Sequence, residues 1–195
     1  MSQRSRHQAQ LSRHVSKRTG LPPEIRQHLI PLSRELWSKH KGYSGKASFF
    51  IEYHQNIINN LSTIQSQLTR SLDHSNQSGI QRLIHQTKQL LKSLDHHHKI
   101  EDQMYFPYFK QNNRNLINAV ELLEKDHKSV EQKIHQLHKL LTKLELYLIK
   151  ANKTYPFALM VQFFEAVQEF EKMIRRHLFD EEEIIIPIFI LDKSF

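Results

Sequence analysis

Four long segments of the sequence carry mostly apolar side chains, with a few histidine, threonine and glutamate residues, at alternating steps of three and four residues. The first stripe runs over residues 47–68, the second over 83–108, the third over 116–148 and the fourth over 163–184. Steps of three and four place side chains on one face of an α-helix. The pattern therefore predicts four amphipathic helices that each bury one stripe.

The segments that separate the stripes are short and polar, as turns are. They cover residues 73–79, 111–113 and 151–154, and Thr154 and Pro156 suit the N-cap and first turn of a following helix. The chain has only four glycines, and it has no cysteine, which excludes disulfides and thiolate metal sites. Short connections make consecutive long helices antiparallel, so the predicted fold is all-α, an up-down-up-down four-helix bundle.

The first 46 residues differ from the rest of the chain in charge. They hold ten Lys and Arg but two Asp and Glu, a net charge of +8, whereas residues 47–195 hold 18 of each kind. We predict a basic N-terminal extension that is disordered over 1–20 and forms a short helical segment over 21–45, followed by the bundle over 47–195. Within the extension we expect helix over 24–39, interrupted at Pro31.

Each apolar stripe is interrupted by one histidine, and these histidines are His54, His97, His127 and His177. An imidazole without a partner is costly in an apolar core. In antiparallel helices, two side chains at one height lie equally far from the turn that joins them. The midpoints of successive histidine pairs fall at residues 75–76, 112 and 152, each inside a predicted turn. The sequence therefore predicts that the four imidazoles lie in one layer.

Carboxylates one helical turn from a histidine join this layer, namely Glu101, Glu131 and Glu181. Two matching blocks, 97–107 and 177–187, each begin with histidine, place glutamate four residues later and end in proline. Positions i and i+4 share a helix face, so each pair can hold one ion. Inward carboxylates and imidazoles need a common partner. Mixed nitrogen and oxygen donors in a bundle favour a pair of iron or manganese ions over a closed zinc site.

Two further histidines, His96 and His98, flank His97. We interpret both as solvated neighbours, with a supporting role behind the ligands as the alternative. A shift of register by one residue would instead pair His98 with Asp102. That shift would break the match between the two blocks.

Over residues 47–190 the chain resembles hemerythrin-like (HHE cation-binding) proteins. The likeness rests on His54, on His127, and on the two His-x-x-x-Glu pairs that begin at His97 and His177. The His-His-x-x-Glu-Asp block that ends in Phe106-Pro107 is fairly specific for that family. The resemblance implies a non-haem di-iron centre with an oxo or hydroxo bridge. Hemerythrins hold this centre with five histidines and two bridging carboxylates, and they bind dioxygen reversibly.

One position departs from the hemerythrin pattern. Where the third helix of hemerythrins carries His-x-x-x-His, this chain has His127-x-x-x-Glu131. The implied set is four histidines and three carboxylates, with Glu101 and Glu181 as bridges and Glu131 as a terminal ligand. Anionic oxygen donors favour ferric iron, which argues against reversible oxygen carriage. The last hemerythrin carboxylate follows its histidine by five residues, which would select Glu182; the internal repeat favours Glu181.

The leading functional hypothesis is a cytoplasmic di-iron protein that interacts with dioxygen, nitric oxide or peroxide as a sensor, store or scavenger. Manganese and zinc rank behind iron. The alternatives are a di-metal oxidase or peroxidase, and a metal-responsive module whose protein partner binds residues 1–46. The neutral bundle argues against nucleic acid, and no apolar run reaches the roughly 18–20 residues that a membrane span needs. Residues 1–20 fit a basic tail better than a mitochondrial transit peptide.

Overall fold

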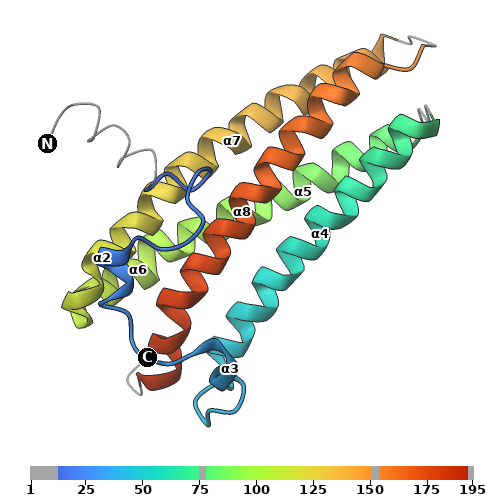
Figure 1. Cartoon of the computed structure of the whole chain (residues 1–195). Coiled ribbons are helices and arrows are strands. Elements are labelled where there is room, and N and C mark those ends of the chain that lie inside the picture. The colour runs from blue at the N-terminus through green and yellow to red at the C-terminus, as the bar shows by residue number, and fades with distance from the viewer. Residues whose placement is uncertain (1–12, 75–77, 151–153, 193–195) are drawn as a thin grey trace, which may run out of the picture.

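The computed structural model describes residues 13–74, 78–150 and 154–192, and these form a bundle of four long helices preceded by a short extension (Figure 1). The elements in chain order are α2 (Pro23–Arg26), α3 (Arg34–Trp37), α4 (Lys46–His74), α5 (Ser78–Ile100), the π-helical turn η1 (Glu101–Tyr105), α6 (Phe106–Asn112), the 3₁₀ turn η2 (Arg114–Leu116), α7 (Ile117–Ile149) and α8 (Phe157–Leu191).

Around the bundle, α4 lies against α5 and α8, and α7 lies against α5 and α8, so each long helix has two long neighbours. Consecutive long helices run in opposite directions (Figure 1). The predicted all-α, up-down-up-down four-helix bundle is therefore confirmed. Among the described residues, none of the helices combines the length and the apolar character needed to cross a bilayer.

The predicted turns have different outcomes. Residues 75–77 and 151–153, and with them the central parts of the first and third turns, lie outside the described residues. The second turn begins later than predicted, because α6 continues to Asn112. The capping prediction for α8 is wrong, since Pro156 occupies the N-cap position and Thr154 instead contacts the hydroxyl of Tyr147 at 2.8 Å.

The core of the bundle consists of two apolar clusters with a polar layer between them. One cluster contains Leu68, Leu83, Leu137 and Phe163, and the other contains side chains from both ends of the chain and from α6. On α4 the order is Phe50, His54, Ile57, so the histidine lies where one cluster ends and the next begins. The same order on the other long helices places all the buried histidines at one height.

A change of helical register occurs directly after this layer on the second helix. In η1 the amide of Phe106 donates to the carbonyl of Glu101, a five-residue step that adds one residue to the turn. The stripe predicted at Met104 and Tyr108 therefore shifts to Phe106 and Phe109, which are fully buried, while Met104 is 63% exposed. Pro107, which has no amide hydrogen to donate, follows the wider turn.

The extension packs on the bundle over residues 13–37. Predicted disorder is wrong for residues 13–20, because Val15 and Arg18 are buried; residues 1–12 lie outside the described residues. The predicted interruption at Pro31 is confirmed, since α2 and α3 are separate short helices on either side of it, but these helices cover less of residues 24–39 than predicted. Trp37 is buried and donates from its indole nitrogen to the carbonyl of Leu32 at 3.0 Å.

Candidate metal centre

The polar layer contains two groups of side chains. Within each group, the potential ligand atoms lie within 4.8 Å of one another. The first group consists of three buried histidines, His98, His127 and His177. The second group consists of His54, His97, Glu101 and Glu181. Six of the seven residues predicted as metal ligands thus lie together in these two groups.

The two glutamates lie between the groups. Glu101 approaches His97 Nε2 at 2.8 Å with one oxygen and His127 Nε2 at 3.6 Å with the other. Glu181 Oε2 lies 3.5 Å from His177 Nε2 and 3.6 Å from His54 Nε2. Each carboxylate therefore faces a histidine of each group, which is the position that a bridging carboxylate requires.

His98 is the largest departure from the expected site. The interpretation of His98 as a solvated neighbour is wrong, since it is 6% exposed and its ring stacks on that of His127 at 4.1 Å between centroids. Adjacent residues of a helix point about 100° apart, and α5 packs against both α4 and α7. His97 thus faces His54 on one side, while His98 faces the third and fourth helices on the other. His96 is exposed, as expected.

The outer nitrogens of three histidines lie beside carboxylates. His54 Nδ1 donates to Glu182 at 3.0 Å, and His127 Nδ1 donates to Asp102 at 2.8 Å. His177 Nδ1 lies 3.5 Å from Asp126, which is the nearest carboxylate to it but makes no hydrogen bond with it in this structure. For His54 and His127, the carboxylate behind Nδ1 fixes the tautomer and leaves Nε2 as a lone-pair donor toward the centre of the bundle, as in many metal sites.

Burial determines the protonation of the ligand atoms. It lowers the pKa of His54 and of His177 to about 4 and that of His97 to about 3, so these imidazoles are neutral near pH 7. Burial likewise raises the pKa of Glu101 and Glu181 well above the ordinary range, and for Glu181 the charge of Glu101 adds to the rise. Neutral imidazoles are ready to bind a metal, whereas the carboxyl groups must release protons when one binds.

The layer is not satisfied by protein groups alone. Among the described side chains, buried atoms without a hydrogen bond of acceptable geometry include Nε2 of His98, His127 and His177 and both oxygens of Glu101 and Glu181, although one oxygen of Glu101 lies 2.8 Å from His97 Nε2. Polar atoms left in this way in a core are strongly destabilising. They are all good ligand atoms for a divalent cation, and they converge, so the residues present fit a metal centre.

Comparison with known protein families agrees with this geometry. The model of the hemerythrin HHE cation-binding domain matches residues 46–189, which include both groups of ligand atoms. The chain belongs to the hemerythrin family. Membership implies that this hemerythrin domain binds a metal cation. Searches of curated proteins and of solved structures found no match.

Glu131 does not join the centre of this hemerythrin domain. It is exposed and belongs to neither group, although it is one turn from His127. Glu131 instead lines a pocket of about 480 Å³. His98, Asp102 and His127 also line this pocket, so it reaches the outer side of the first group. The histidine that completes the first group comes from α5 rather than from α7.

The alternative ligand Glu182 also lies outside both groups of the hemerythrin domain. Its carboxylate accepts from His54 Nδ1 and pairs with Arg34 at 2.5 Å, so it supports a ligand from behind. Asp102 and Asp126 have the same role, which we did not predict. The second acidic residue of the His-His-x-x-Glu-Asp block was a usable signal for Asp102, whereas the sequence gives none for Asp126.

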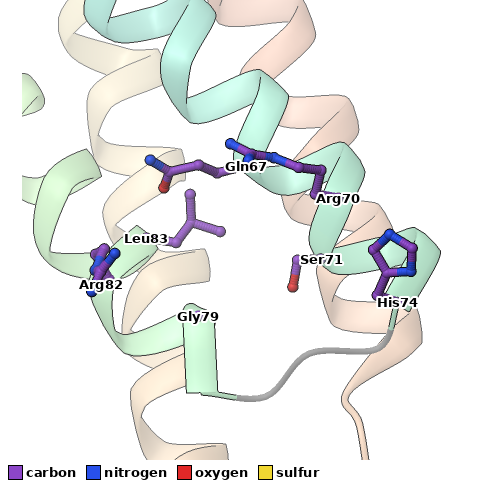
Figure 2. Close-up of a pocket in the computed structure, with 7 residues that line it drawn as sticks. All are labelled: Gln67, Arg70, Ser71, His74, Gly79, Arg82 and Leu83. Carbon is purple, nitrogen blue, oxygen red and sulfur yellow. The ribbon is translucent and has the colours of Figure 1, made fainter.

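A different pocket lies at one end of the bundle, between the last turns of α4 and the first turns of α5 (Figure 2). Its volume is about 390 Å³, and its lining includes the side chains of Arg70, His74 and Arg82. None of the seven residues that line it is a carboxylate, and His74 is its one histidine. In the hemerythrin domain the chemistry of a cation site is therefore found in the buried layer and not in this basic pocket.

Proposed function

We propose that the chain binds two iron ions in the polar layer and uses them to bind dioxygen or a related small ligand reversibly. The observation that carries this proposal is the position of Glu101 and Glu181, each of which faces a histidine of both groups. A single ion would not need two carboxylates between two separate sets of imidazoles. Two ions in adjacent sites, with both carboxylates between them, would give partners to Nε2 of His98, His127 and His177 and to the oxygens of Glu101 and Glu181.

The donor set supports iron. It comprises five imidazoles and two carboxylates, because His98 lies in the layer and Glu131 does not. This is the count that hemerythrins use for a di-iron centre. A preference for ferric iron would require Glu131 as a third anionic donor. With the neutral imidazole of His98 in its place, the ligand set instead favours reversible oxygen binding.

The two groups differ in the number of imidazoles, and this difference indicates where a small ligand binds. The first group offers three histidines, whereas the second offers His54 and His97 beside the shared carboxylates. A metal in the second group is left with more open positions. Phe50 packs over both of its rings, with centroids 4.4 Å from His54 and 5.6 Å from His97. Such an apolar cover would hinder the access of water and favour small, weakly polar ligands.

The direct test is to reconstitute the full chain with ferrous iron without oxygen, measure iron per chain, and then follow absorption as oxygen is added and removed. We expect about two irons per chain and an absorption band that returns to its starting value when oxygen is removed. One iron or fewer per chain would refute the di-iron proposal. Two irons with irreversible oxidation would refute the reversible binding and leave the centre in place.

His98→Gln separates the observed ligand set from the one predicted from the repeat. We expect the first group to bind its iron more weakly than in the wild type, because it keeps only two of its three histidines, and the iron content under a competing chelator to fall from about two toward one per chain. His96→Gln, two residues away and exposed, is the matched control and should retain about two irons, as should Glu131→Gln. Loss of iron in Glu131→Gln with full loading of His98→Gln would reverse the assignment. Far-UV circular dichroism of each variant checks that the bundle is intact.

A further inference from the structure

The N-terminal extension contacts the metal layer through two arginines, Arg18 and Arg34. Both belong to the basic first 46 residues, and the match to the hemerythrin domain begins only at residue 46. The stretch that carries them is fixed on the bundle by buried apolar residues, among them Val15, Leu21 and Trp37. The arginines are therefore held in place by an element that lies outside the matched domain.

Arg18 is buried behind the first group of histidines. Its side chain is 1% exposed, and its Nη1 and Nε donate to Asp126 at 2.8 Å and to Asp180 at 2.6 Å. Asp126 is the carboxylate beside Nδ1 of His177. Arg176 also pairs with Asp180, so two guanidinium groups balance two carboxylates. Without Arg18, Asp126 would be a buried anion with no cationic partner to hold it against His177.

Arg34 has the same relation to the second group. It donates to Glu182 at 2.5 Å and to Glu183 at 2.9 Å, and its guanidinium packs between the rings of Trp37 and Phe179. Glu182 accepts from Nδ1 of His54 at 3.0 Å. Stacking on two rings fixes the plane of the guanidinium and with it the direction of the carboxylate.

We infer that residues 13–37 act as a positioning segment for the metal centre, with Arg18 orienting His177 through Asp126 and Arg34 orienting His54 through Glu182. The segment thus supports one ligand in each group. Carboxylates behind metal-bound histidines set ring orientation and basicity, and their loss typically weakens metal binding about 10–100-fold. The inference rests on the proposed di-iron function, because it concerns ligands of that centre.

The test is the rate at which a ferrous chelator removes iron from the reconstituted, anaerobic full chain. Arg18→Gln should accelerate release of the iron held by the first group, and Arg34→Gln release of the iron held by the second. Each variant is expected to show one fast phase, about tenfold or more above the wild-type rate, and one phase at the wild-type rate. The double variant should lose both ions in the fast phase.

Matched variants separate positioning from general loosening of the fold. Arg34→Lys keeps the charge and loses the planar fork, so it should restore part of the wild-type rate. Arg13→Gln, which removes an exposed pair with Glu24 in the same segment, should leave both phases unchanged. Arg34 is partly exposed, so its variant remains informative if Arg18→Gln folds poorly.

Three results would overturn the inference. They are release at the wild-type rate in both glutamine variants, equal acceleration of both phases by either variant, and failure of Arg34→Lys to improve on Arg34→Gln. Wild-type protein that binds fewer than two irons would instead refute the proposed function. The two failures are therefore distinguishable in one experiment.

Discussion

Glu181→Gln is expected to reduce the iron content of the reconstituted chain from about two ions to well below one. Glu181 is fully buried, and its Oε2 lies between His177 of the first group and His54 of the second. The amide is neutral and presents one acceptor oxygen, so it neither bridges two cations nor balances their charge. Because both groups share this carboxylate, its loss removes a ligand from each ion.

Two further glutamates on α8 make this experiment specific. Glu169 is exposed and pairs with Lys133 at 2.8 Å, so Glu169→Gln should bind iron as the wild type does. Glu182→Gln should still load both ions, with about 10–100-fold weaker binding at the second group, because it supports His54 without facing the centre. The opposite result would be two irons in Glu181→Gln and no iron in Glu182→Gln. It would show that the last ligand follows its histidine by five residues, as in hemerythrins, and not by four, as in the internal repeat. Iron per chain and the binding isotherm decide between these results.

Removal of iron is expected to destabilise the folded chain by about 4 kcal/mol for each ion, about 8 kcal/mol for two, when free iron had been about a thousand times the dissociation constant of each site. For a chain of this length, the loss of both ions corresponds to a fall of about 16–32 °C in the thermal midpoint. The physical reason is the set of orphaned ligand atoms in the layer, which no protein group satisfies among the described residues. Differential scanning calorimetry of the iron-loaded and chelated protein measures the shift.

The control for that shift is the variant that is expected to lose its iron. Glu181→Gln should unfold at nearly the same temperature with and without added iron, because it binds little iron in either condition. A midpoint of the wild type that does not depend on iron would contradict the prediction. It would mean that the layer is equally stable with its carboxyl groups protonated, as burial of Glu101 and Glu181 favours in the metal-free chain.

Much of the fold and part of the centre could be predicted because helical periodicity and turn positions are local properties of the sequence. The four stripes define the helices, and equal distances from the turns place His54, His97, His127 and His177 at one height. Those rules apply to regular α-helices. They could not anticipate the extra residue in η1, which exposes Met104 and buries Phe106.

The remaining site residues depend on contacts between distant parts of the chain. His98 appeared to be a neighbour of a ligand because a single stripe was assigned to its helix, whereas α5 packs against helices on two sides. Arg18 appeared to belong to a disordered basic tail, because composition does not reveal that two buried aspartates lie 108 and 162 residues farther along the chain. Pairings over such separations are set by packing of the finished fold.

The polar layer between two apolar clusters has a consequence for how the sequence can vary. If the layer holds iron, metal–ligand bonds connect the four helices at the level of the layer. The fraction of chains that contain these bonds then depends on the supply of iron. A replacement in either apolar cluster that weakens packing would then be tolerated in a cell rich in iron and would unfold the same chain in a starved one. Core substitutions in this protein are therefore expected to behave as conditional mutations, whose effect depends on the concentration of available iron and not on temperature.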